Sequence, residues 1–176
     1  METPILLRRN FLKTATSLTP VLLGTGAALS SSCASQQKKL EQNKAVIIRE
    51  VKDFWNAKDL SVANQIYSSD LVTHTPNAPD GNYDSYVKES GEAFAAFPDL
   101  HLTIEDLIAE GDKVVKRWKL DGTHKKDWMG IPATGEKIFF NGICIFRIKD
   151  GKIAESWEYM NLLDVLQQLG VIPPLG

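Results

Sequence analysis

Glu158 is the side chain whose sequence setting best suits proton transfer. Residues 152–160 alternate in a way that predicts a strand, so Ser156, Glu158 and Met160 should share one face. A carboxyl group buried among apolar side chains has its ionised form disfavoured and can exchange protons near neutral pH. The alternative is a carboxylate at the rim of the fold, paired with a basic residue.

Other chemical patterns are missing from the sequence. His74, His101 and His124 are too scattered for a metal-ligand spacing, and no C-x-x-C or H-E-x-x-H pattern occurs, so we expect no metal. No G-x-S-x-G elbow or phosphate-binding glycine loop is present, so we expect neither a nucleophilic hydrolase nor a nucleotide or other cofactor. Cys144 lies inside a predicted strand without a histidine partner, which favours a small packed residue over a nucleophile.

Aromatic and apolar side chains are abundant enough to line a pocket for a flat, largely apolar small molecule. The residues expected in that lining are Trp55, Tyr67, Phe97, Trp128, Phe140, Cys144 and Phe146. The formal net charge is −2, and no basic stripe or RNA-binding aromatic motif occurs, so we expect no nucleic-acid partner.

Helices and then strands must position these residues. Helical spacing of apolar residues predicts a helix ending near residue 55, a short helix over 59–67 and another over 83–97, with a short strand at 71–75. Four further strands are predicted at 100–109, 113–124, 137–149 and 152–160, followed by a last helix at 161–170. Gly111-Asp112 and Asp150-Gly151 lie between these strands as two-residue turns, so we expect an antiparallel sheet.

Several ordered segments resemble one known family. They are Gly122-Thr-His124, residues 130–135, residues 145–153 and Glu155-Ser-Trp157, preceded by Phe97-Pro-Asp-Leu100 and residues 104–112. This series is similar to the SnoaL-like polyketide cyclase or ester cyclase group of the nuclear transport factor 2 superfamily. The resemblance implies an α+β cone, in which three or four helices and a curved antiparallel sheet enclose a pocket.

The resemblance also implies roles for individual residues. Ring-closing members carry an aspartate acid/base just after the strand tryptophan, where this chain has Glu158. Related epoxide hydrolases carry a pocket arginine at the position of Arg117, which could pair with Glu158; the alternative is a surface arginine in a basic run. His74 matches a frequent pocket histidine, although it could instead be a rim histidine bonded to loop backbone. His124 is expected mainly to fix the loop that carries Trp128.

The N-terminal segment, residues 1–34, looks like a twin-arginine export signal. Arg8 and Arg9 precede a weakly apolar stretch that falls short of the roughly 20 strongly apolar residues of a membrane-spanning helix. Ser30-Ser-Ser-Cys33 resembles a lipoprotein box with Cys33 as the acylated residue; the alternative is ordinary cleavage before Ser35. We therefore expect a periplasmic protein or a membrane-anchored lipoprotein, with a tether at residues 35–40 and the SnoaL-like domain at 41–176.

Together these inferences predict an exported domain that binds a small apolar carbonyl-bearing ligand. It could catalyse cofactor-free cyclisation or isomerisation with Glu158, Arg117 and His74 as polar contacts. The alternative is a non-catalytic binding or assembly module, which Gly142 and Cys144 favour because they stand where the cyclases carry polar partners. Homodimerisation through the outer face of the sheet is also expected. Convergence of the three polar residues around a cavity would support catalysis.

Overall fold

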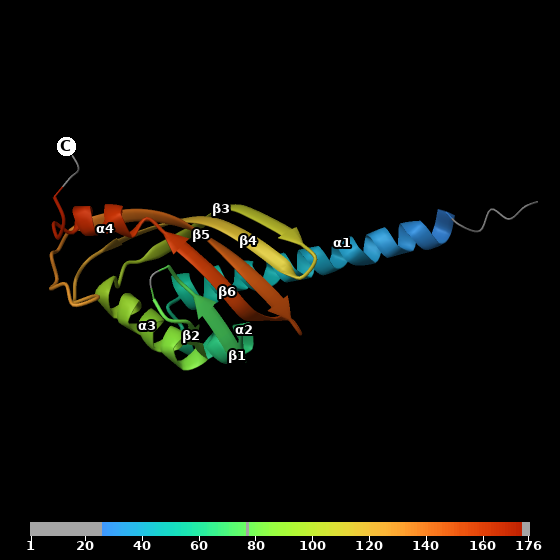
Figure 1. Ribbon diagram of the computed structural model, residues 1–176, viewed down its shortest axis with the longest axis horizontal. Coiled ribbons are helices and arrows are strands. Elements are labelled where there is room, and N and C mark those ends of the chain that lie inside the picture. Colours follow the sequence, from blue (N-terminus) through green and yellow to red (C-terminus); the bar gives the residue numbers. More distant parts are fainter. Residues whose placement is uncertain (1–25, 77, 174–176) are drawn as a thin grey trace, which may run out of the picture.

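The computed structural model describes residues 26–76 and 78–173, with side chains from residue 33 onward. It is an α+β fold in which a curved, open six-stranded sheet is covered on one face by helices (Figure 1). The helical elements are α1 (Gly26–Arg49), η1 (Glu50–Asn56), η2 (Leu60–Val62), α2 (Ala63–Ile66), α3 (Tyr83–Ala96) and α4 (Leu162–Gln168). The strands are β1 (Tyr67–His74), β2 (Gly81–Asn82), β3 (His101–Glu110), β4 (Lys113–Thr123), β5 (Lys137–Lys149) and β6 (Lys152–Met160).

The sheet has the order β2-β1-β6-β5-β4-β3, and its four long strands were predicted from alternation to within a residue or two. The β5–β6 turn forms because Asp150 and Gly151 both adopt positive φ, 51° and 75°, as a type I′ turn requires. Bulges between Ile104 and Asp106 and between Arg147 and Ile148 break the regular pairing. Such bulges bend strands, which helps the sheet to curve over the helices.

One pairing differs from the expected antiparallel arrangement. Strand β1 lies parallel to β6, with Thr73 opposite Ser156 and His74 opposite Trp157. The prediction of a wholly antiparallel sheet came from the hairpin turns, which say nothing about a strand that joins the sheet from the helical layer. The short strand β2, which pairs with the end of β1, was not predicted.

The first helix changes its winding where it reaches the sheet. Helix α1 continues into η1, a π-helical segment beginning at Glu50. The Asn56 side chain, at the end of η1, accepts from Leu102 N (2.8 Å) and donates to Leu102 O (2.9 Å). This two-bond clip ties η1 to β3 and fixes the position of Glu50 over the sheet.

The expected tether at residues 35–40 is part of α1, whose N-terminal part projects beyond the sheet (Figure 1). Side chains 33–39, including Cys33, are exposed. The twin-arginine motif lies outside the described residues. Among the helices described, none combines the length and apolar character needed to cross a membrane.

Candidate functional site

A pocket lies between the helical layer and the concave face of the sheet. Its empty volume, including the space at its open mouth, is about 550 Å³. The lining is mostly apolar and aromatic, with two carboxylates, one ammonium and one phenol among it. The lining residues are Glu50, Trp55, Tyr86, Ala93, Phe97, Leu100, Leu102, Lys116, Trp118, Leu120, Trp128, Phe140, Cys144, Glu158 and Met160.

Three of these residues form a row across the floor. Lys116 of β4 pairs with Cys144 of β5, which in turn pairs with Glu158 of β6. Neighbouring strands lie about 4.8 Å apart, so the Cα atoms of Lys116 and Glu158 are about 10 Å apart, with Cys144 between them. A small ligand lying over Cys144 could therefore contact a cation at one end and a carboxyl group at the other.

Glu158 faces the pocket, as strand alternation predicted. It is half-buried, and it lines the cavity beside Cys144 and Met160. Burial raises the pKa of Glu158 to about 7, since the charges of Glu50 and Glu89 add to the effect of burial and together outweigh the attraction of Lys116. A carboxyl group with this pKa is present in both protonation states at neutral pH, which suits it to accept and return a proton.

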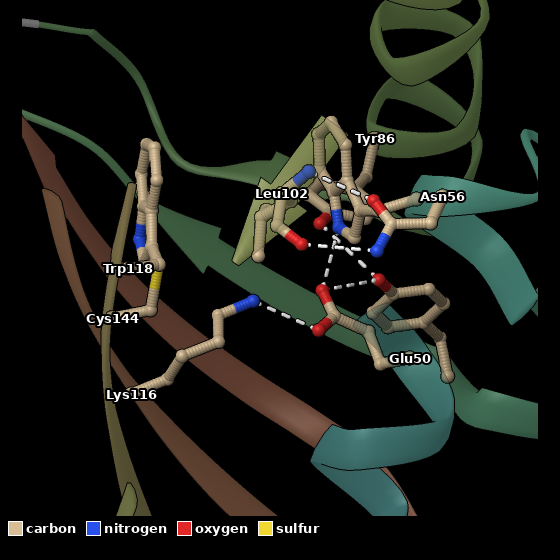
Figure 2. Close-up of polar contacts among 9 residues, drawn as sticks. Glu50, Asn56, Tyr86, Leu102, Lys116, Trp118 and Cys144 are labelled. Atoms are coloured by element: carbon tan, nitrogen blue, oxygen red, sulfur yellow. Dashed lines mark hydrogen bonds and ion pairs between the residues drawn. The ribbon is translucent and has the colours of Figure 1, made fainter. Parts of the chain in front are cut away.

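Glu50 anchors a buried polar network at the other end of the row (Figure 2). Its Oε2 accepts from Lys116 Nζ at 2.8 Å, and both side chains are almost completely buried, at 2% and 1% exposure. Its Oε1 accepts from Trp55 Nε1 at 2.6 Å and from the Tyr67 hydroxyl at 3.2 Å. Glu50 therefore accepts hydrogen bonds from three donors, which is how a buried carboxyl group is satisfied.

The Glu50–Trp55 contact depends on the π-helical winding. In an α-helix a side chain five positions along is rotated by about 140° and could not meet its partner. The wider turn of η1 brings Trp55 back toward Glu50, and π-helical segments are frequent at functional sites.

Lys116 is a charged group held in an apolar setting. Burial by itself would lower the pKa of its ammonium, but the charge and hydrogen bond of Glu50, with Cys144 and Glu158, outweigh burial and raise it. The ammonium also lies 5.0 Å from the centre of the Phe146 ring, a cation–π contact. Lys116 therefore remains protonated at neutral pH.

Cys144 and Gly142 shape the floor without adding charge. Burial raises the pKa of the Cys144 thiol far above its ordinary value, and its Sγ accepts from Trp118 Nε1 at 3.2 Å. The ring of Trp118 covers Gly142, where an added Cβ would lie 2.5 Å from that ring. Glycine at position 142 therefore leaves room for the Trp118 ring, which lines the pocket. The raised pKa makes Cys144 unsuited to act as a nucleophile.

The loop at the pocket wall is fixed by His124, as predicted. His124 is completely buried, stacks on Phe97 (centroids 5.2 Å apart), and its Nδ1 accepts from Thr134 N at 3.3 Å. The turn from Trp128 to Ile131 is closed by two backbone hydrogen bonds of 3.0 and 2.8 Å. Trp128 then packs edge-on against Phe97, so both rings line the pocket.

Arg117 does not join the pocket. It lies on the outer face of β4, because its neighbours Lys116 and Trp118 take the inner face. Its guanidinium contacts Glu105 and, at 2.7 Å, Asp106. The expected ion pair with Glu158 is therefore wrong, and the surface alternative describes the structure.

His74 also lies on the outer face, at the end of β1. Its Nε2 contacts Glu155 at 3.0 Å and its Nδ1 contacts Asp80 at 2.8 Å, while its ring stacks on Trp157. The hydrogen bonds to Glu155 and Asp80 raise the pKa of His74. The expected convergence of His74, Arg117 and Glu158 is therefore wrong, since only Glu158 faces the cavity.

Five of the seven residues expected in the pocket lining are found there. Trp55, Phe97, Trp128, Phe140 and Cys144 line the pocket. Tyr67 and Phe146 lie just behind the lining, where Tyr67 bonds to Glu50 and Phe146 contacts the ammonium of Lys116.

Sequence reasoning missed Glu50 and Lys116, although both carry a detectable signal. Glu50 interrupts the apolar stripe that runs from Ile47 to Phe54 along the helix. Lys116 stands between Val114 and Trp118 on the buried face of β4. A lone acid on one apolar face and a lone base on another indicate a buried pair.

Comparison with known proteins supports the fold and family. The sequence profile described as SnoaL-like polyketide cyclase matches residues 45–169, well over half of the chain. The chain belongs to the SnoaL-like polyketide cyclase family. The comparison with curated protein sequences found no match to this chain.

Several solved structures superpose well on the chain. AclR, a proposed hydroxylase from Streptomyces galilaeus, is 29% identical with a TM-score of 0.71, covering 78% of this chain and 86% of its own. TsrD from Streptomyces laurentii is 26% identical (TM-score 0.68; 75% and 97% covered). IdmH from Streptomyces antibioticus, a proposed polyketide cyclase, is 29% identical (TM-score 0.65; 74% and 99% covered). The SnoaL-like fold supports a cyclase, isomerase or ligand-binding role.

Proposed function

We propose that this protein is a cofactor-free acid/base enzyme that cyclises or isomerises a small, largely apolar carbonyl compound, with Glu158 as the proton-transfer group. The observation that carries the proposal is a half-buried carboxyl group, facing an apolar cavity, whose pKa is raised to about 7. Perturbed carboxyl groups of this kind gather at catalytic sites. Membership of the cyclase family supports the same chemistry.

The proposed reaction begins with proton abstraction. The Glu158 carboxylate takes a proton from a carbon next to the carbonyl group, and the electron pair of the broken C–H bond moves toward the carbonyl oxygen. The resulting enolate either takes the proton back from Glu158 at a carbon conjugated with it, or attacks a second carbonyl carbon of the same molecule, whose oxygen then takes the proton from Glu158. Neither outcome needs an oxidant or a cofactor.

A non-catalytic binding module is the alternative. Gly142 and Cys144 supply no charge and no strong donor beside Glu158, and Cys144 stays a thiol. Such a protein would hold the same kind of ligand in the same pocket without changing it.

Ligand capture distinguishes the two functions. The chain from Ser35 onward, purified from its native host and denatured, would release any bound small molecule for mass spectrometry. The catalytic proposal expects a carbonyl compound that wild type converts and that Glu158→Gln binds but leaves unchanged. Glu155→Gln, the same change on the outer face of β6, should convert it normally. Equal, unchanged retention by wild type and Glu158→Gln would establish the binding module.

We also propose that the protein is exported and carries a lipid on Cys33. The exposed side chains of residues 33–39 on the projecting part of α1 support this, because a lipid there would leave the pocket clear. Mass spectrometry of the mature protein from the native host tests the proposal. A diacylated N-terminal Cys33, lost in Cys33→Ser, is expected, whereas an unmodified N-terminus at Ser35 would contradict it.

A further inference from the structure

The pocket contains several nitrogen and oxygen donors, and most have their hydrogen already committed. Trp55 donates to Glu50, and Trp118 donates to Cys144. Tyr67, just behind the wall, donates its single hydroxyl proton to Glu50. These groups therefore have no free N–H or O–H hydrogen to donate to a ligand.

The phenol of Tyr86 is committed by the same chain of hydrogen bonds. Its oxygen lies 3.3 Å from that of Tyr67. Because the Tyr67 proton points to Glu50, the bond between the two phenols must be donated by Tyr86. Tyr86 is thus unable to donate to a ligand oxygen without breaking a buried bond.

Lys116 is different because an ammonium has three donors. Among the described residues its hydrogen-bond partner is Glu50, at 2.8 Å, and the side chain lines the cavity. Figure 2 shows the chain of Lys116 extended toward Glu50, with Cys144 beside it. The other two N–H groups of this cation have no hydrogen-bond acceptor among the described residues, although the ammonium also lies 5.0 Å from the centre of the Phe146 ring. Trp128, on the 128–131 turn, adds only a neutral indole donor.

We propose that Lys116, held by Glu50, binds the oxygen that becomes negatively charged during the reaction, so that the substrate is an enolisable ketone lying across Cys144. Its carbonyl oxygen would contact Lys116 Nζ, and its acidic C–H would point to Glu158. This inference rests on the proposed function. It adds a substrate class and a second catalytic residue.

The charges of Lys116 and Glu158 determine the roles of these two residues. Glu158 breaks the C–H bond and gains the proton, and the electron pair passes through the new C=C bond to the oxygen held by Lys116. Return of the proton from Glu158 to carbon restores the carbonyl group. A fixed cation is effective here because it stabilises the enolate more than the neutral ketone. Glu50 is a positioning residue, since it touches Lys116 and not the substrate.

Two probes test the inference separately from the proposed function. The first, 2-naphthol, is a stable mimic of an enol whose absorbance distinguishes its neutral and ionised forms. Below its solution pKa, the pocket should bind it as naphtholate. The second, 2-tetralone, reports proton abstraction through exchange of its α-hydrogens for deuterium, measured by NMR.

The key variant is the double substitution Glu50→Gln/Lys116→Met, which removes both charges and keeps the shapes, so that no unpaired charge is left buried. It should bind 2-naphthol in neutral form and about 10- to 100-fold more weakly, the loss expected for a hydrogen bond to a charged donor. Lys119→Met, the equivalent change on the outer face of β4, should bind as wild type does. Trp128→Phe should also retain the ionised form.

The outcomes separate the two claims. Neutral 2-naphthol in wild type, or ionised 2-naphthol in the double variant, would overturn the role of Lys116 even if exchange into 2-tetralone depends on Glu158. Loss of exchange in Glu158→Gln, with naphtholate binding retained, supports both claims. Naphtholate binding with exchange that is indifferent to Glu158→Gln would refute the acid/base function and keep the anion-binding role of Lys116.

Discussion

Glu158 and Glu50 are two glutamates near one pocket with different tasks, and their surroundings set the difference. Glu50 accepts from three donors, including the ammonium of Lys116, and holds that lysine in place. Glu158 has no comparable set of donors among the described residues, and burial raises its pKa to about 7. The contrast separates a structural carboxylate from one able to exchange protons.

The raised pKa of Glu158 predicts a pH-dependent stability. The pKa is higher in the folded protein than the ordinary value of 4.5, so the native state binds more protons between 4.5 and about 7. The free energy of unfolding must therefore fall as pH rises through this window. At about 1.4 kcal/mol per pKa unit, reduced for the partial exposure of Glu158, the loss is roughly 2 to 3 kcal/mol.

Glu158→Gln should remove this dependence, because glutamine resembles the protonated acid at every pH. Urea unfolding should find the variant close to wild type at pH 5 and more stable than wild type at pH 8. A wild-type advantage at pH 8 would mean that Glu158 is ionised and satisfied in the native state. That result would remove the physical basis of the proposed catalysis.

At the scale of elements, Gly142 of β5 leaves room for the Trp118 side chain of β4, which lines the pocket. Trp118 of β4 lies across Gly142, and the indole N–H is fixed on Cys144 two residues along the same strand. Gly142 and Cys144, which carry no charge, therefore position the ring of Trp118.

Gly142→Ala should destabilise the protein by about 1 to 3 kcal/mol, the usual range for overpacking. The added methyl group would lie 2.5 Å from both the Trp118 ring and the backbone oxygen of Tyr159, and the backbone oxygen is not free to move aside. Chemical denaturation measures the loss, with exposed Asn141→Ala on the same strand as the control. Unchanged stability would show that Trp118 has room to shift.

At the scale of the whole molecule, the inner face of the sheet lines the pocket and the outer face carries an apolar strip. Ile143 and Tyr159 are paired across β5 and β6 and are 45% and 59% exposed. Ile145 and Trp157, both half-buried, form the next pair on the same face. Contiguous exposed apolar side chains of this kind are typical of an interface between subunits.

We propose that two copies associate through this strip, and sedimentation velocity tests it. Wild type should sediment as a dimer and Tyr159→Lys as a monomer, since a self-complementary interface would bring the two introduced charges close together. Val171→Lys, at an exposed position beyond α4, serves as the control and should stay dimeric. A monomeric wild type at high micromolar concentration would contradict the proposal.

The sequence by itself determined the elements, because alternation, helical spacing and turn residues act over a few positions. Strands β3 to β6, the Asp150-Gly151 turn and the inward direction of Glu158 are all local properties of this kind. Only the tertiary structure decided which charges meet. Glu50 and Lys116 are 66 positions apart, and they meet where the clip from Asn56 to Leu102 of β3 holds η1 against the sheet. Arg117 and His74 pair with carboxylates on the outer face of the sheet. Which face of the sheet is covered by helices is decided by how the layers pack.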